Sequence, residues 1–296
     1  MSTNFLPSEI AQLTEETSIA LAQSIKQIPI TTPLSKQPVV TTYVRQGNGG
    51  TPILLLHGFD SSVFEFRRLI PLLAAKNETW TVDLLGFGFT ERLAGISVST
   101  TVIKTHFYYF WKTLIDEPVI LVGASMGGAA AIDFTLSYPE AVKKLVLIDG
   151  AGYKAPPNMG RFMVPPLGNL ATAFLRNPKV RQRISINAYH DPSFASLDAQ
   201  LCAALHLKSQ GWQQALIAFT KSGGYQSFGE KLSEIKQPTL ILWGESDRIL
   251  GTRDAHKFKE AIAHSQLMWI KDCGHVPHLE QPQVTAKHIL EFKDVA

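Results

Sequence analysis

The chain is poor in cysteine, in charge and in long apolar runs. Its 296 residues include two cysteines, Cys202 and Cys273, which cannot build a disulfide framework and indicate a reducing compartment. Charged residues make up 18% of the sequence, below the roughly 25% of an average soluble domain, so we expect part of the surface to be apolar. A net charge of +3 is too small for a dedicated nucleic-acid binder, and no nucleic-acid partner is expected.

The sequence has no run of about 18 apolar residues, which argues against a membrane-spanning helix. The N-terminus lacks the basic and apolar regions of a secretory signal, because Glu9, Glu15 and Glu16 interrupt it. We therefore expect an intracellular protein that is cytoplasmic or peripherally bound to a membrane. Residues 1–35 are expected to form a helical extension lying on the main domain.

Short apolar runs alternate with helical patterns along most of the chain. Runs that are apolar at nearly every position are typical of parallel strands covered by helices on both faces. The sequence therefore predicts a mostly parallel, doubly wound α/β core over residues 36–150 and 231–296. Strands are expected at 39–44, 53–56, 80–83, 119–122, 145–148, 240–243 and 267–270, and helices at 62–76, 100–115, 126–137, 252–263 and 281–293.

The strand pattern is missing between residues 151 and 230, which predicts a helical cap inserted over the carboxyl edge of the sheet. This segment contains eight basic and three acidic residues, so it is positively charged. Its apolar residues Phe162, Met163, Leu167 and Phe174 are the expected substrate-binding residues. One interpretation is a well-packed cap; the other is a basic, apolar lid that contacts a lipid surface or a lipophilic substrate.

The motif G-x-S-x-G occurs at residues 123–127, between a buried run and a helix of small residues. This context is typical of a nucleophile elbow, in which a sharp turn presents Ser125 above the sheet edge. The glycines at 123 and 127 are expected because a Cβ there would collide with strand or helix. The alternative, a serine in an ordinary glycine-rich turn, does not explain the strand and helix on either side.

A serine nucleophile needs a base, and His275 is the predicted one because it follows the last expected strand. His57 is its main rival, but this arrangement orders its triad Ser, Asp or Glu, then His, which favours a late histidine. The remaining histidines, His278 among them, are expected to be structural. Asp247 is the predicted carboxylate that orients the imidazole; the alternatives are Glu245, Asp272 and Asp149.

The oxyanion of an acyl-transfer intermediate needs two hydrogen-bond donors. We expect the backbone N–H groups of Met126 and Phe59 to supply them, with Asp60 as a less favoured donor. The sequence contains no H-E-x-x-H or C-x-x-C motif, so neither a metal site nor a cofactor is expected.

With these motifs, the chain beyond about residue 50 resembles the α/β-hydrolases. More narrowly it resembles the chlorophyll dephytylases of plants and cyanobacteria, on the segments 57–62, 81–88, H-F-Y-Y-F-W-K at 106–112, S-G-G-Y at 222–225 and D-C-G-H-V-P-H at 272–278. The resemblance implies a cap-bearing α/β-hydrolase fold and hydrolysis of the phytyl ester of chlorophyll to chlorophyllide and phytol. It also implies that Ser125, Asp247 and His275 form the triad. The basic charge of the cap would suit the anionic lipids of the thylakoid membrane, so peripheral association with that membrane is expected beside a cytoplasmic location.

Other functions of this scaffold stay open. Dehalogenases and epoxide hydrolases need a carboxylate at position 125, so the serine argues against both. General carboxylesterases and carbon–carbon bond hydrolases keep the serine. A ligand receptor on the same fold is a non-enzymatic alternative, and it would hydrolyse a p-nitrophenyl ester hardly faster than buffer does. The sequence indicates no particular oligomeric state.

Overall fold

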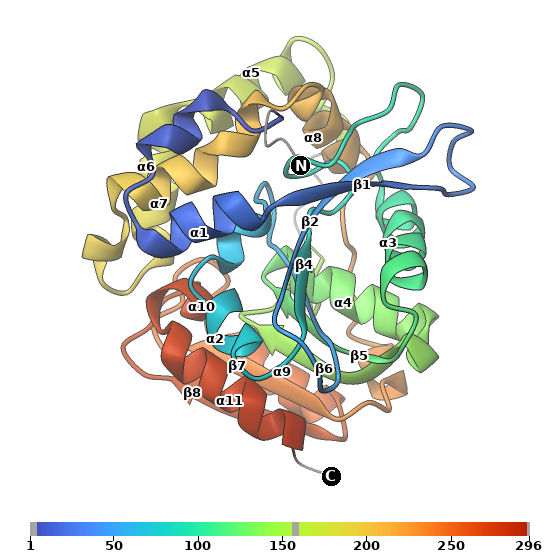
Figure 1. Ribbon diagram of the computed structural model, residues 1–296, viewed down its shortest axis with the longest axis vertical. Helices are drawn as coiled ribbons and strands as arrows, with labels where there is room; N and C mark the ends of the chain where they lie inside the picture. Colours follow the sequence, from blue (N-terminus) through green and yellow to red (C-terminus); the bar gives the residue numbers. More distant parts are fainter. Residues whose placement is uncertain (1–4, 156–159, 295–296) are drawn as a thin grey trace.

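The computed structural model describes residues 5–155 and 160–294, and its centre is one eight-stranded sheet (Figure 1). The strand order is β1-β2-β4-β3-β5-β6-β7-β8. The pairs β1–β2 and β2–β4 are antiparallel, and every other neighbouring pair is parallel. The strands are β1 (Lys26–Ile30), β2 (Val39–Gln46), β3 (Ile53–Leu56), β4 (Thr79–Val82), β5 (Val119–Ala124), β6 (Val142–Ile148), β7 (Thr239–Gly244) and β8 (Ser265–Ile270).

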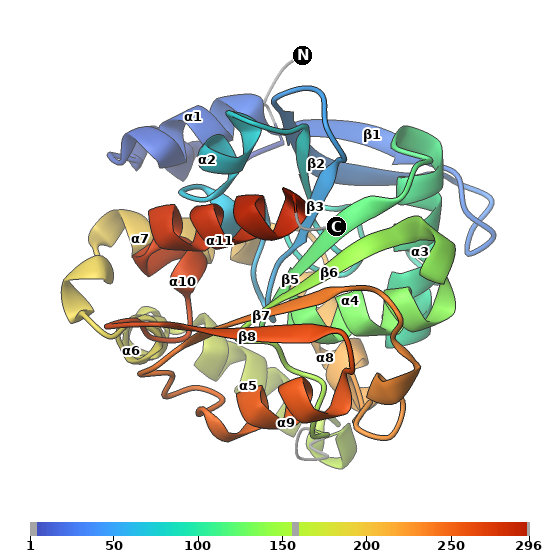
Figure 2. The same cartoon turned by 90° about the horizontal axis from the view of Figure 1, so that it is seen from below.

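Helices cover both faces of the sheet (Figure 2). One face carries α1 (Glu16–Ser24), α2 (Ile70–Ala74), α10 (Pro277–Glu280) and α11 (Pro282–Asp294); the other carries α3 (Thr100–Leu114), α4 (Met126–Ser137) and α9 (Arg253–Ala261). Side chains of β3 alternate between two apolar cores, Leu54 and Leu56 in one and Ile53 and Leu55 in the other. All four are fully buried, which confirms the predicted sheet with helices on both sides.

Two predicted elements differ from the structure. The residues expected as a helical extension, 1–35, include a strand, because Lys26–Ile30 pairs antiparallel with β2 at the sheet edge. Its polar residues and Pro29 do not give the apolar run by which the other strands were predicted. An edge strand tolerates proline and needs no such run. The helix expected over 62–76 is divided into a 3₁₀ helix, Val63–Phe66, and α2, because Pro71 lies in the first turn of a new helix.

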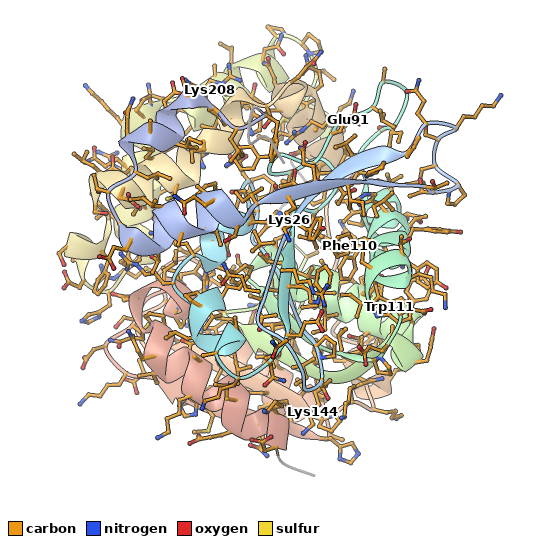
Figure 3. The ribbon with its side chains drawn as sticks, in the orientation of Figure 1. Lys26, Glu91, Phe110, Trp111, Lys144 and Lys208 are labelled. Carbon is orange, nitrogen blue, oxygen red and sulfur yellow. The ribbon has the colours of Figure 1, made fainter. Side chains whose placement is uncertain are left out.

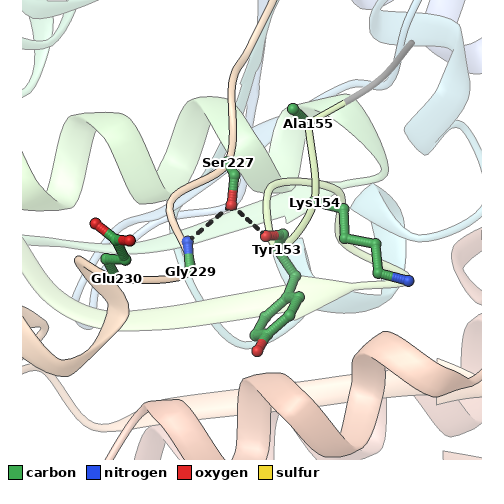
Figure 4. Close-up of a pocket in the computed structure, with 6 residues that line it drawn as sticks. All are labelled: Tyr153, Lys154, Ala155, Ser227, Gly229 and Glu230. Carbon is green, nitrogen blue, oxygen red and sulfur yellow. Dashed lines mark hydrogen bonds between the residues drawn. The ribbon is translucent and has the colours of Figure 1, made fainter.

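Among the described residues between β6 and β7 there are four α-helices, namely α5 (Leu167–Arg176), α6 (Pro178–Ala188), α7 (Leu197–Ala204) and α8 (Trp212–Lys221). The segment that enters this cap from β6 and the segment that leaves it toward β7 are joined by hydrogen bonds. Phe228 N–H donates to the carbonyl of Gly152 at 2.8 Å, and Ser227 Oγ donates to that of Tyr153 at 2.5 Å (Figure 4). No helix within residues 5–155 and 160–294 has the length and hydropathy that a bilayer crossing requires.

Three side chains labelled in Figure 3, Phe110, Lys144 and Lys208, connect outer elements with the sheet or with one another. Phe110 of α3 packs on Trp80 with ring centroids 6.3 Å apart, at the antiparallel end of the sheet. Lys144 Nζ donates to the carbonyl of Phe292 at 2.9 Å and so ties the end of α11 to β6. Lys208 of the cap pairs with Glu9 near the N-terminus.

Asp198 of α7 joins the cap to the start of α1. Its buried carboxylate accepts hydrogen bonds from the backbone N–H groups of Thr14 and Glu15, at 2.6 and 3.0 Å, and from Ser18 Oγ at 2.5 Å. Burial acts to raise the pKa of this carboxyl, but the hydrogen bonds outweigh it and hold the pKa below its ordinary 3.8.

We predict that Asp198→Asn lowers the free energy of unfolding by about 1–3 kcal/mol at neutral pH, because buried donors lose a charged acceptor. Since the folded pKa is lowered, the difference from wild type is full above pH 3.8 and disappears as the pH falls through the folded value. Urea unfolding between pH 3 and pH 7 measures it. Glu16→Gln, at an exposed position, is the control. Equal stability of Asp198→Asn and wild type at pH 7 would show that the hydrogen bonds of Asp198 to the start of α1 do not stabilise the fold.

Candidate active site

Ser125 occupies a strained turn between β5 and α4. Its backbone dihedral angles are φ 51° and ψ −120°, a conformation that non-glycine residues rarely adopt and that marks functional turns. Hydrogen bonds hold the turn: Ser125 N–H donates to Ile148 O at 3.0 Å, and Ser125 O accepts from Gly128 and Ala151 at 2.9 and 2.8 Å. The side chain is thereby presented at the carboxyl edge of the sheet.

The glycines on either side of Ser125 allow this turn because the surrounding backbone is too close for a side chain. A Cβ on Gly123 would overlap the carbonyl group of Gly127, and a Cβ on Gly127 would overlap the carbonyl oxygen of Leu56 in β3. The start of α4 therefore packs directly on two strands, as the motif predicts.

Three side chains distant in the sequence form one hydrogen-bonded chain. His275 Nε2 lies 2.9 Å from Ser125 Oγ, and His275 Nδ1 lies 3.0 Å from Asp247 Oδ2. The other oxygen of Asp247 accepts from the N–H groups of Ile249 and Leu250, at 2.7 and 3.1 Å. Burial acts to raise the pKa of Asp247, but these hydrogen bonds and His275 lower it, so the carboxylate stays ionised beside the imidazole.

The rival residues lie elsewhere. His57 is fully buried; its Nδ1 donates to Gly58 O at 2.8 Å and its Nε2 accepts from Leu84 N–H at 3.1 Å, so both ring nitrogens serve the backbone. Burial lowers the pKa of His57 and keeps the ring neutral. The alternative carboxylates Glu245 and Asp272 are exposed, and neither has a hydrogen bond to His275.

Asp149, the third alternative acid, lies at the end of β6 next to Asp247. Its Oδ1 accepts from Gly244 N–H at 3.1 Å. Burial, followed by the charge of Asp247, raises its pKa well above the ordinary value, so we assign it a proton. Ligand atoms of Asp149, Asp247 and His275 lie within 4.8 Å of one another, a spacing that suits a metal ion. The donor atoms of His275 and Asp247 are however committed to the relay just described.

The two expected oxyanion donors belong to the residue after Ser125 and to the loop after β3. Met126 begins α4, and Phe59 stands in the loop after β3, where it lines the same pocket as Ser125. In the part of the chain that the structure describes, neither backbone N–H donates to a protein acceptor. The preceding N–H, that of Gly58, is bonded to Glu65 Oε2 at 2.9 Å.

Asp60 fastens the cap to this loop. Its carboxylate accepts from Arg181 Nη1 and Trp212 Nε1, both at 2.7 Å, and lies 3.1 Å from His206 Nε2. These partners come from α6, from α8 and from the segment between α7 and α8. Burial acts to raise the pKa of Asp60, but His206, Arg181 and Trp212 lower it to about 2.

A cavity of about 310 Å³ borders Ser125 and His275, and the cap contributes Leu175, Arg181 and Ile184 to its wall. The expected substrate-binding residues do not line it: Phe162, Leu167 and Phe174 lie on the outer face of the cap, with 42, 50 and 62% of their surfaces exposed, and Met163 is half-buried. The physical reason is that α5 turns its small residues, Gly168 and Thr172, inward.

Two polar residues of this cavity have a place that the sequence did not predict: Glu65 was not among the candidate residues, and His278 was expected to be structural. Glu65 Oε1 and His278 Nε2 are 3.3 Å apart, and both side chains are buried in the wall of the cavity. The glutamate oxygens and Ser125 Cβ all lie within 3.4 Å of the position that a Cβ on Gly58 would take. No motif marks Glu65, and the position of His278 three residues after His275 is its one signal.

The hollow in Figure 4 is a different surface feature. It is shallow, and Tyr153, Lys154, Ser227 and Glu230 at the cap junction line it. None of the residues of the Ser125 relay borders it, so it is not the candidate active site.

Comparison with known proteins supports the same fold. Residues 51–282 match the family described as alpha/beta hydrolase fold. The chain is 33% identical to the alpha/beta hydrolase domain-containing protein VTE7 of Arabidopsis thaliana, over 97% of this chain and 89% of that protein. It is 29% identical to a 2-hydroxy-6-oxononadienedioate/2-hydroxy-6-oxononatrienedioate hydrolase of Klebsiella pneumoniae, over 83% of this chain and 88% of that one.

Among solved structures, an esterase of Thermogutta terrifontis superposes with a TM-score of 0.77 at 21% identity, covering 90% of this chain and 97% of that chain. At this level of identity the similarity shows the fold. The predicted α/β-hydrolase fold is therefore confirmed.

We predict that Gly127→Ala lowers the free energy of unfolding by about 1–3 kcal/mol, because the new Cβ overlaps Leu56 O and forces α4 away from β3. Urea unfolding measures the change. Gly229→Ala is the matched control, since a Cβ there has its nearest neighbours at an ordinary 3.4 Å. If both variants were as stable as wild type, the close packing of the elbow would be refuted.

Proposed function

Because the chain belongs to the α/β-hydrolase fold family, we propose that it is a serine hydrolase that cleaves carboxylic esters of lipophilic alcohols. The observation that carries the proposal is the unbroken chain of hydrogen bonds from Asp247 through His275 to Ser125. A serine hydroxyl becomes a useful nucleophile when a base removes its proton, and a carboxylate that orients the base also stabilises the imidazolium formed.

The mechanism we propose has two acyl-transfer steps. His275 Nε2 takes the proton of Ser125 Oγ while that oxygen attacks the ester carbonyl carbon. His275 then gives the proton to the departing alcohol oxygen, which leaves an acyl group on Ser125. A water molecule attacks this acyl-enzyme with the same proton transfers and releases the carboxylic acid.

The backbone N–H groups of Met126 and Phe59 stabilise the oxyanion in both steps. Preorganised donors of this kind are worth several kcal/mol in a site that excludes water. Gly58, which precedes Phe59, does not donate to the site, because its N–H is bonded to Glu65. Hydrogen bonds to Glu65 and Asp60 on either side of Phe59 therefore hold the loop in place for the reaction.

For the substrate we propose the phytyl ester of chlorophyll. The supports are the resemblance to chlorophyll dephytylases and the exposed apolar residues of the cap. Burying the C20 chain of phytol contributes about 0.8 kcal/mol per CH₂. We define the apolar outer face of the cap as its exposed residues Phe162, Val164, Leu167, Leu170 and Phe174.

The same face suggests contact with an anionic membrane. Leu170 and Phe174 are each 62% exposed on α5, an exposure that costs free energy in water and is recovered at a bilayer surface. The adjoining Lys179 and Arg183 of α6 are also exposed, and each cation contributes about 1 kcal/mol near anionic lipid. Peripheral attachment to the thylakoid membrane is the localisation that we propose.

Carbon–carbon bond hydrolysis is the second candidate. The Klebsiella relative, 29% identical, is named as such a hydrolase of a 2-hydroxy-6-oxo dienedioate. The serine at position 125 is compatible with that reaction, so the substrate panel of the experiment below includes it.

We predict that the purified protein releases chlorophyllide from chlorophyll a, and that Ser125→Ala lowers the rate by on the order of 10⁴–10⁶ while the fold stays intact. Chromatography of products from chlorophyll a, pheophytin a, simple acyl esters and a 2-hydroxy-6-oxo dienoate measures it. Cleavage of simple esters alone would refute the chlorophyll assignment. A Ser125→Ala protein as active as wild type would refute the nucleophile, and no turnover of any compound would favour a receptor.

We also predict binding to vesicles of phosphatidylglycerol that weakens by on the order of tenfold in the double variant Leu170→Glu, Phe174→Glu, because two exposed apolar side chains become anionic. Cosedimentation measures the bound fraction. Leu197→Glu is the matched control, since Leu197 is 84% exposed but lies on α7. Equal binding of the double variant and wild type would show that this face does not meet the membrane.

A further inference from the structure

Buried polar atoms without a hydrogen-bond partner gather around the active-site cavity. Of the eight such side-chain atoms among the described residues, five are nitrogens of Arg67, Arg181 and His278. All three side chains line the cavity that Ser125 borders. A buried N–H without an acceptor is unfavourable, so a concentration of such donors in one cavity points to a ligand that supplies acceptors.

Arg67 is the strongest donor of the group. It is 2% exposed; Nη1 donates to Phe64 O at 3.4 Å and the side chain of Tyr189 lies close to the guanidinium, but Nε and Nη2 have no acceptor with hydrogen-bond geometry. Its nearest carboxylate is Glu15, whose Oε2 is 3.7 Å from Nε, but both oxygens of Glu15 are bonded to Arg68 at 2.6 and 2.8 Å. The carboxylate of Glu15 thus balances the charge of Arg67 without accepting a hydrogen bond from it. Since a guanidinium stays protonated and carries five N–H groups, Nε and Nη2 remain available as donors.

His278 lines the same cavity and contacts Glu65. Its ring packs on Phe66 with centroids 5.3 Å apart, and its Nε2 lies 3.3 Å from Glu65 Oε1, an ion-pair contact. Its Nδ1 has no hydrogen-bond partner although the residue is 1% exposed. When the ring is protonated, as an ion pair with Glu65 requires, both nitrogens carry a hydrogen, and the Nδ1–H is the donor left without an acceptor.

We infer that this end of the cavity, defined by Arg67 and His278, is a subsite that binds a neutral carbonyl oxygen of the substrate, in a keto group or a second ester. The inference rests on the proposed function, because it assumes an ester held at Ser125. A neutral acceptor fits better than a carboxylate, since Glu65 is an anion in the same wall and Glu15 and Asp60 already balance Arg67 and Arg181.

The subsite implies discrimination against purely aliphatic esters. An alkyl chain in this part of the cavity displaces water and leaves the donors of Arg67 and His278 unpaired. Sites built to hydrogen-bond an acceptor reject analogues that lack it more strongly than apolar pockets reject a change in size. The substrate class is thus an ester whose lipophilic part adjoins a second carbonyl group.

The test compares three esters of equal chain length on the full-length protein: hexyl hexanoate, hexyl 5-oxohexanoate and 5-oxohexyl hexanoate. A pH-stat follows acid release. We expect at least one keto ester to have a kcat/KM on the order of tenfold above hexyl hexanoate. In Arg67→Met, which keeps the aliphatic stem, this ratio falls to about one. The exposed Arg253→Met is the matched control and keeps the wild-type ratio.

His278→Phe is the second variant. It is needed because Arg67→Met leaves Glu15 without the charge of Arg67, which can unfold the protein. Circular dichroism checks that both variants are folded. Equal kcat/KM for all three esters, or a keto preference that both variants retain, overturns the subsite. A preference for monohexyl adipate over the keto esters overturns the neutral acceptor.

Binding to Ser125→Ala separates the two proposals. Calorimetry with hexyl hexanoate and the two keto esters needs no turnover, so tighter binding of a keto ester supports the subsite even if the wild type cleaves none of them. Equal binding overturns the subsite. If the wild type hydrolyses all three esters at equal rates and Ser125→Ala binds them equally, the subsite is refuted while the proposed serine hydrolase activity is supported.

Discussion

The close approach of α4 to β3 and β5 is the constraint on which the site depends. Where a side chain at position 127 would overlap the backbone of β3, glycine lets the helix start directly above the sheet edge. Ser125 is then forced into a left-handed conformation, and its hydroxyl reaches His275. A looser junction would relieve the strain and separate these atoms, since the hydrogen bond of 2.9 Å leaves little tolerance.

The cap is fastened to the core on both sides of this serine. On one side Asp60, adjacent to the expected oxyanion donor, holds Arg181 and Trp212 of the cap. On the other, Glu280 accepts from Gly274 N–H next to His275 and from His190 N–H of the cap, at 2.7 and 3.0 Å. The cap therefore does more than cover the cavity: its seating and the geometry of both catalytic loops are coupled through buried carboxylates.

Much of this arrangement could be predicted from the sequence, because local patterns encode it. Apolar runs marked the strands of the parallel sheet, and the motif around Ser125 together with the chain order of triads selected His275 and Asp247, which the structure brings together. Strand β1 was missed because an edge strand needs no apolar run. The outward orientation of Phe174 and the placing of Glu65 beside Ser125 depend on how helices pack, which no local pattern specifies.

The central claim is that the contact with His275 makes Ser125 reactive, and covalent labelling tests it most directly. The protein is treated with a fluorophosphonate, which phosphonylates activated serines, and the adduct is located by peptide mass spectrometry. The account predicts a single fast adduct on Ser125 in the wild type, and labelling slowed by on the order of 10³-fold or more in His275→Ala. Labelling of Ser125 at the same rate in His275→Ala, or an adduct on another serine, would contradict it.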